Sequence, residues 1–177
     1  MQHELLDGRR LRFPVGIRHG ESIPGIVARG VRRHVLVRTT PVLQAAGVKI
    51  RHIGLSQIAT HEELERLAFV TRCPPNNLIE RAGDRLIERN GPRSYGARFG
   101  RLVIPRGYLE FNRRRIGPVT LANDAYHRAS WMNLLLPFCP ESFERLIDRC
   151  NHSDEGLGWF YSQGIGHCDN CRRVVVA

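Results

Sequence analysis

The chain has 177 residues, of which 42% are hydrophobic. That length and apolar share allow one domain, or two small ones, with a packed core, and they exclude a wholly disordered chain. No apolar stretch approaches the roughly 20 residues that cross a bilayer, which excludes a membrane-spanning helix. Residues 1–15 carry no long apolar run, which argues against a secretory signal. We therefore expect a soluble, cytoplasmic protein.

The charge of the chain is strongly positive and unevenly spread. Lys and Arg number 27 against 17 acidic residues, a net charge of +10. Residues 1–92 and residues 93–128 each carry a net +6, whereas residues 129–177 carry −2. Such a field attracts polyanions, of which nucleic acid is the commonest large one. On the patterns described below, we expect these three ranges to form a helical, helix-turn-helix-like domain, a basic Arg-rich linker and a zinc-ribbon-like domain.

The first predicted helices follow an N-terminal loop or short strand. Apolar residues recur at helical spacing over 23–31, with Ser22 as a plausible N-cap and Pro24 tolerated in the first turn. Thr40 and the proline after it read as the N-cap and first residue of a second, short helix. Gly47 is the expected end of that helix.

Residues 60–90 predict a pair of helices around a tight break. Thr60 and Glu63 have the spacing of a capping box, and Cys-Pro-Pro at 73–75 interrupts the chain. We expect the second helix to run from residues 76–77 to the Gly-Pro at 91–92. A helix-turn-helix would use it to contact nucleic acid, whereas plain core packing in a helical bundle has equal weight. Its cations are Arg81, Arg85 and Arg89.

The middle of the chain is rich in Gly, Pro and Arg. Residues 91–107 interleave Arg with Tyr95 and Phe99, which is typical of a loop or hinge and can also follow a nucleic-acid backbone. Three adjacent cations follow, and they form either a solvated turn or a set of phosphate contacts. These cations are Arg113, Arg114 and Arg115.

The cysteines cluster near the C-terminus, where four of the five lie. In a reduced compartment such clustering indicates a metal before disulfides. Cys168 and Cys171 have zinc-knuckle spacing, and Cys150 lies where a second pair is expected. For the fourth ligand we choose His152, one residue before the standard position, Ser153. Two further candidates for this position are His167 and Asp154.

The number of protein ligands decides what the metal would do. Four would close the site, and a closed zinc site is structural, because the metal holds a module too small for its own core. If His152 does not bind, a water molecule could take the fourth position. Cys139 is expected to be a small buried hydrophobe. We expect a short amphipathic helix over 143–147 and a strand over 157–161.

Three stretches of the sequence resemble the TniQ family of transposition proteins. They are GESIPGIVARGVRRH, HEELERLAFV, and the run from Tyr126 to Cys171. The most specific part is the order His-Arg-x2-Trp, Cys-Pro, Leu-x2-Arg-Cys and Cys-x2-Cys. The resemblance covers residues 13–171, and the short length is similar to that of the CRISPR-associated members.

The chain departs from the family pattern at its zinc fingers. The first finger of the family opens with Cys-x2-Cys, which is missing from VTLANDAYHRASW, and Ser142 replaces the histidine of Cys-Pro-x-His. We expect this finger to be lost and replaced by apolar packing around Trp131, Leu135 and Phe138. The second finger has Ser153 where a cysteine is usual. The resemblance therefore implies one zinc ion rather than two.

The resemblance implies a non-catalytic adaptor in target selection for DNA transposition. Such an adaptor connects a target recogniser, either a DNA site or a CRISPR effector with its guide RNA, to an AAA+ ATPase regulator of the TnsC or TniB kind. The implied fold is mainly α with small β, with an N-terminal helix-turn-helix-like domain and a C-terminal zinc-ribbon module. Whether DNA or RNA is the main nucleic-acid partner, and whether the protein forms a homodimer, stay open.

Two other functional classes compete with the adaptor. One is a sequence-specific, zinc-containing transcription regulator that reads DNA with residues 60–89. The other is a zinc hydrolase. The sequence has no G-x4-G-K-[ST] phosphate loop, and its Ser and His residues match no nucleophile motif. We therefore expect no catalytic activity.

Overall fold

The computed structural model describes residues 6–7, 10–48, 52–87, 94–161 and 163–175. Its fold is mainly α with small β, as the sequence predicts. Within the described residues, every helix falls short of the length and apolarity that a membrane span requires. The elements in chain order are β1 (Leu6–Asp7), β2 (Arg10–Leu11), α1 (Ile23–Arg33), α2 (Thr40–Ala46), η2 (Ile53–Ile58), α3 (His61–Thr71), α4 (Pro75–Ile79), β3 (Asp84–Ile87), β4 (Ser94–Phe99), β5 (Leu102–Pro105), η3 (Arg106–Tyr108), α5 (Pro118–Asn123) and η4 (Ala129–Met132).

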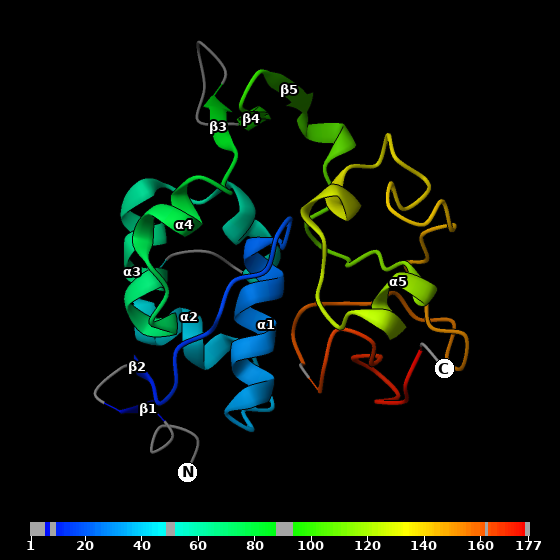
Figure 1. Ribbon diagram of the computed structural model, residues 1–177, viewed down its shortest axis with the longest axis horizontal. Coiled ribbons are helices and arrows are strands. Elements are labelled where there is room, and N and C mark those ends of the chain that lie inside the picture. The colour runs from blue at the N-terminus through cyan, green and yellow to red at the C-terminus, as the bar shows by residue number, and fades with distance from the viewer. Residues whose placement is uncertain (1–5, 8–9, 49–51, 88–93, 162, 176–177) are drawn as a thin grey trace.

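Figure 1 shows how these elements are arranged. Helices α1 to α4 gather on one side, and strands β3 to β5 lie above them in this view. The chain after β5 forms the other side, where α5 is its only labelled helix and most of the path is irregular.

Helices α1 and α2 lie where the sequence predicts them, and each begins within about one residue of its expected start. The Oγ of Ser22 accepts a hydrogen bond from the backbone N–H of Gly25, and Pro24 lies in the first turn of α1. The apolar face of α1 is buried. Helix α2 begins one residue earlier than expected, with Thr39 at the N-cap position, and it ends at Gly47 in the left-handed conformation.

Helix α3 has the predicted capping box. The Thr60 side chain accepts from the Glu63 backbone, and the Glu63 side chain accepts from the Thr60 backbone. The helix after the Pro-Pro break is shorter than predicted, because α4 ends at Ile79 and residues 84–87 form a strand. The Gln57 side chain binds the Arg81 carbonyl, and the Gln57 carbonyl accepts from Gly83. These tertiary bonds take backbone groups that a longer helix would use itself.

The expected loop over residues 91–107 contains two strands instead. Strand β4 pairs antiparallel with both β3 and β5, with Ala97 opposite Arg85 and Ile104. The prediction of a loop was wrong. It followed from the low strand propensity of the Gly residues in this stretch, but strand β4 is stabilised by pairing on both of its edges and by the burial of Ala97. Beneath this sheet lies a small apolar cluster made of Ile58, Ala97, Ile104, Leu109, Phe111 and Met132.

A larger apolar cluster runs through the rest of the molecule. It begins at Leu11, includes the buried face of α1 and Trp131, and continues to Val175. Cys150 and Cys168 belong to the same cluster. The C-terminal region therefore packs against the helices through a shared core.

The C-terminal region has little regular structure. The expected helix over 143–147 is absent from this described stretch, where Phe143 is left-handed with a φ of 59° and Leu146 donates to the Pro137 carbonyl. The expected strand over 157–161 is reduced to one isolated bridge, between Tyr161 and Arg38. Tight turns, rather than helix or sheet, organise this part of the chain.

Candidate metal centre

Three turns with the same backbone geometry shape the C-terminal region. In each, the N–H of a cysteine donates to the carbonyl five residues later, and the N–H four residues later donates back to the cysteine carbonyl. The N–H to carbonyl distances lie between 2.8 and 3.0 Å in all three. The residue four after the cysteine is left-handed, with φ between 54° and 61°. The three turns begin at Cys139, Cys150 and Cys168.

Two of these turns bring three thiols together. The Sγ atoms of Cys150, Cys168 and Cys171 lie within 4.8 Å of one another, and those of Cys150 and Cys171 are 3.6 Å apart. Cys150 and Cys168 are buried, and Cys171 is partly exposed. A group of this size and composition can hold a metal ion, and soft thiolate donors suit zinc.

Local hydrogen bonds prepare the thiols for a metal. The backbone N–H groups of His152 and Asn170 donate to the Sγ atoms of Cys150 and Cys168, at 3.3 and 3.4 Å. Burial opposes ionisation of Cys150, but the hydrogen bonds from His152 and Ser153 outweigh it and lower the pKa of this thiol to about 6. The thiolate is the form that binds a metal.

The predicted fourth ligand, His152, does not join the three thiols. Its Nε2 lies 3.2 Å from the Val174 carbonyl on the exposed side of the turn. The hydroxyl of Ser153 lies 3.6 Å from the Sγ of Cys168 instead. Asp154 faces Arg149, at 3.7 Å, and His167 is outside the group as well. His152 points away from the thiols because it is the third residue of the turn that begins at Cys150. In this turn the first and fourth residues, Cys150 and Ser153, point inward.

The turn at Cys139 holds a cluster of polar side chains. The Thr120 hydroxyl lies 3.4 Å from the Cys139 Sγ and 2.8 Å from the Ser142 hydroxyl. The Glu144 carboxylate accepts from the Thr120 hydroxyl and from the backbone N–H of Val119 and Thr120, so it caps α5 from a distant turn. Burial raises the pKa of Cys139, but hydrogen bonds from Thr120, Ser142 and Trp131 lower it to about 7.

This cluster corrects the expected replacement for the first finger. Trp131 and Cys139 are fully buried, as predicted, and the indole N–H donates to the Cys139 Sγ at 3.4 Å. Leu135 and Phe138 are 56% and 52% exposed, so they do not fill the space. The side chains of Thr120, Ser142 and Glu144, which are hydrogen-bonded to one another, lie beside Cys139 instead.

Two of the three adjacent arginines are buried. Arg114 is 2% exposed and pairs with Asp169 at 2.7 Å, and its guanidinium also donates to the carbonyls of Gly158 and His167. Asp169 in turn accepts from the backbone N–H groups of Phe160 and Tyr161. This ion pair attaches the third cysteine turn to the body of the protein.

Arg115 is buried in a similar way. Its guanidinium donates to three backbone carbonyls, those of Trp131, Asn133 and Leu136. The prediction of phosphate contacts is therefore wrong for Arg114 and Arg115, whose donors are used inside the fold. Burial lowers the pKa of both guanidinium groups. Arg113 remains half exposed, 3.7 Å from Asp148.

The arginines predicted after α3 are not on one helix face. Arg81 follows α4, is partly buried, and donates to the Asn77 carbonyl at 2.8 Å. Arg85 lies on β3, and its side chain is outside the described part of the structure. Arg89 lies outside the described residues.

The opening motif and the His-Arg motif meet in the core. Ser22 donates its backbone N–H to the His127 carbonyl at 2.9 Å, and its hydroxyl lies 2.8 Å from the His127 Nδ1. Gly25 allows a close approach here, because a Cβ at this position would lie 3.0 Å from the His127 Cβ. Glu21 bridges to Arg128 through the backbone and accepts two hydrogen bonds from Arg29.

His127 is neutral in this environment. It is fully buried between Trp131 and Trp159, with ring centroids 5.4 and 4.9 Å away. Burial, together with the nearby charge of Arg114, lowers the pKa of His127 to about 3. The Ser22–His127 contact thus joins helix α1 to the C-terminal region and is closed to solvent.

Comparisons with known proteins found no match for this chain, neither to a protein-family model nor to a curated protein. A functional assignment therefore depends on the arrangement of the described residues and on the motifs quoted above. Sequence reasoning missed the Arg114–Asp169 pair and the Ser22–His127 contact, because their partners lie far apart in the chain.

Proposed function

We propose that this protein is a non-catalytic adaptor in target selection for DNA transposition. It would link a target recogniser, a DNA site or a CRISPR effector with guide RNA, to an AAA+ ATPase regulator of transposition. The observation that carries the proposal is the contact between Glu21-Ser22 and His127-Arg128. The two pairs of residues belong to separate stretches of the TniQ resemblance. If each stretch resembled the family only by chance, there would be no reason for the two to pack together in the core, as they do here.

One structural zinc ion is part of the proposal. The thiols of Cys150, Cys168 and Cys171 supply three soft donors, and Ser153 or a water molecule would lie at the fourth position. The ion would tie together two turns that share no regular secondary structure. Since residues 150–161 and 163–175 form no helix or sheet of their own, metal binding would contribute directly to the folding free energy of this region.

The competing proposal, a site-specific DNA regulator, loses its main support. A helix-turn-helix reads DNA with its second helix in the major groove. In this protein α4 has five residues, and the chain turns into β3 where that helix would continue. The same finding also removes the helix-turn-helix-like part of the fold that the TniQ resemblance implies. The proposal of an adaptor is therefore supported by the contact between Glu21-Ser22 and His127-Arg128 and not by this region.

Affinity capture tests the adaptor directly. The tagged full chain should retain an AAA+ ATPase encoded beside its gene, and the two should elute together in size-exclusion chromatography. An AAA+ protein from an unrelated operon is the matched control and should pass through. Equal retention of both ATPases, absence of such a neighbouring gene, or catalytic turnover by the purified chain alone would overturn the proposal.

A further inference from the structure

An aromatic side chain on the outer surface of α3 separates two pockets. Phe69 is 50% exposed and lines both of them. The larger pocket has a volume of about 500 Å³, and Arg10 and Arg72 contribute to its wall. The smaller pocket, of about 330 Å³, is lined mainly by Ala45, Ala46, Glu65, Arg66, Phe69 and Val70. One ring therefore forms the boundary between a basic pocket and a more apolar one.

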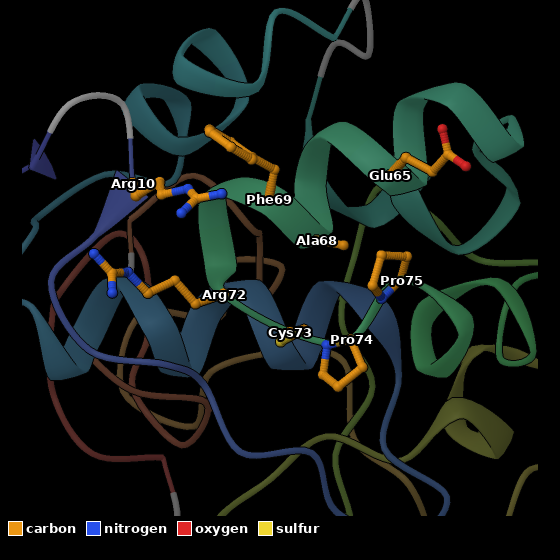
Figure 2. A pocket seen from close by; sticks show the side chains of 8 residues that line it. All are labelled: Arg10, Glu65, Ala68, Phe69, Arg72, Cys73, Pro74 and Pro75. Carbon is orange, nitrogen blue, oxygen red and sulfur yellow. The ribbon is translucent and has the colours of Figure 1, made fainter.

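Arg10 is held against this ring. Its guanidinium carbon lies 3.6 Å from the centroid of Phe69, which is a close cation–π contact. The Nε of Arg10 is buried and has no hydrogen-bond partner among the described residues. In Figure 2, Arg10, Phe69 and Arg72 lie toward one end of the pocket and Glu65 toward the other. The cation–π contact therefore places the Arg10 guanidinium beside Phe69 at the basic end of the pocket.

The chain after Arg10 repeats this combination of groups. Arg12 and Arg33 both lie over the ring of Phe13, at 5.4 and 5.6 Å from its centroid. Phe13 is about as exposed as Phe69, and the backbone of Val15 binds the end of α3. Exposed phenylalanines with arginines beside them are the typical surface of proteins that bind single-stranded nucleic acid.

We infer that Phe69, Arg10 and Arg72 form a binding site for one nucleotide unit of a single-stranded nucleic acid. A phosphate would enter the basic pocket, and the base would stack on the face of Phe69 opposite Arg10. Glu65 would accept a hydrogen bond from the base, and its negative charge would repel phosphate toward the end of the pocket that holds Arg10 and Arg72. The inference rests on the nucleic-acid partner of the proposed function, and it moves the nucleic-acid site away from the buried Arg114 and Arg115.

The chemistry favours a single strand over other partners. A base in a duplex is stacked on both faces and cannot reach Phe69 without unstacking. An acidic peptide would satisfy the arginines, but only one that also carries an aromatic residue would place a flat ring on Phe69, whereas every nucleotide carries one. A nucleotide has both an anionic and an aromatic part, and the two pockets separate these parts.

The ring is tested with a fluorescein-labelled 15-nucleotide oligothymidylate and fluorescence anisotropy on the full chain. Phe69→Leu keeps apolar bulk but removes the ring, and it should weaken binding by about 5- to 150-fold, the range for one stacked base. Phe69→Tyr should restore the affinity. The control is Phe143→Leu, because Phe143 is 81% exposed and lines neither of these two pockets.

The basic end is tested by its salt dependence. Arg10→Gln combined with Arg72→Gln should lower the slope of log affinity against log salt, by up to about 0.7 for each phosphate of a single strand that the variant no longer neutralises. Arg98→Gln combined with Arg101→Gln removes the same charge at exposed positions and should leave the slope unchanged. A labelled 15-base-pair duplex should respond equally weakly to all of these variants.

Several results would overturn this site. They are absence of oligonucleotide binding by the wild type, equal affinities for Phe69→Leu and Phe143→Leu, or a loss of ATPase capture in Phe69→Leu with oligonucleotide binding intact, which would assign the surface to a protein partner. The two proposals fail separately. Captured ATPase with an insensitive Phe69 would overturn only the site, whereas a sensitive Phe69 without ATPase capture would overturn only the adaptor.

Discussion

The buried pair of Arg114 and Asp169 gives the sharpest stability prediction. Arg114→Met removes the cation and leaves Asp169 as a charge that is 12% exposed. The carbonyls of Gly158 and His167 lose a donor at the same time. Breaking a buried ion pair from one side costs about 3–5 kcal/mol. We therefore expect the free energy of unfolding to fall by about that amount.

Urea denaturation followed by circular dichroism measures this loss. The matched control is Arg113→Met, one residue earlier. Arg113 is 47% exposed, and its pair with Asp148 is exposed and long, at 3.7 Å. An exposed pair of this kind contributes at most about 1 kcal/mol. Arg114→Met combined with Asp169→Asn should recover part of the loss, since the asparagine leaves no unpaired charge and can still accept from Phe160 and Tyr161.

The reasoning fails under two results. One is a free energy of unfolding for Arg114→Met within about 1 kcal/mol of that for Arg113→Met. The other is a double variant no more stable than Arg114→Met alone, which would show that the cost does not come from the stranded carboxylate.

Three further predictions address the metal, the buried histidine and the close approach at α1. Cys168→Ser should lose bound zinc in elemental analysis and native mass, whereas Cys73→Ser, whose thiol donates to a carbonyl, should keep it; full zinc in both variants would contradict the site. Because the pKa of His127 is lowered to about 3, the unfolded chain binds the extra proton first. The stability that comes from keeping His127 neutral is complete above about pH 6.5. It declines as the pH falls toward 3, so the free energy of unfolding is lower by about 2 kcal/mol at pH 5. His127→Gln should remove this part of the slope in urea titrations, and an unchanged slope would contradict a buried neutral imidazole. Gly25→Ala should destabilise by about 1–3 kcal/mol although alanine favours helices, whereas Gly107→Ala, which faces open space, should be near neutral in thermal unfolding.

Local signals predicted the parts of the fold that depend on residues close in sequence. The N-cap at Ser22, the capping box at Thr60 and the end of α2 at Gly47 each need only a side chain or backbone within one turn. The pair of Cys168 and Cys171 was predictable for a similar reason, since knuckle spacing fixes how a tight turn aims its thiols. Cys150 was predicted from the usual interval between two such pairs, and the tertiary structure brings it to them.

Long-range contacts decided what these signals could not. Residues 80–87 have a helical apolar pattern, but Gln57 and β4 take their backbone hydrogen bonds, and a helix becomes a strand. The side chain beside the three thiols is that of Ser153 rather than His152, because backbone geometry sets the direction of each side chain in the turn.

The sequence by itself determined helices α1 and α2, the three thiols and the net charge. It could not decide which charges reach a partner. Arg113, Arg114 and Arg115 are adjacent and chemically identical, yet one is half exposed and two are buried against carbonyls and a carboxylate. Burial depends on which distant backbone groups need a donor, and only the tertiary structure brings those groups together.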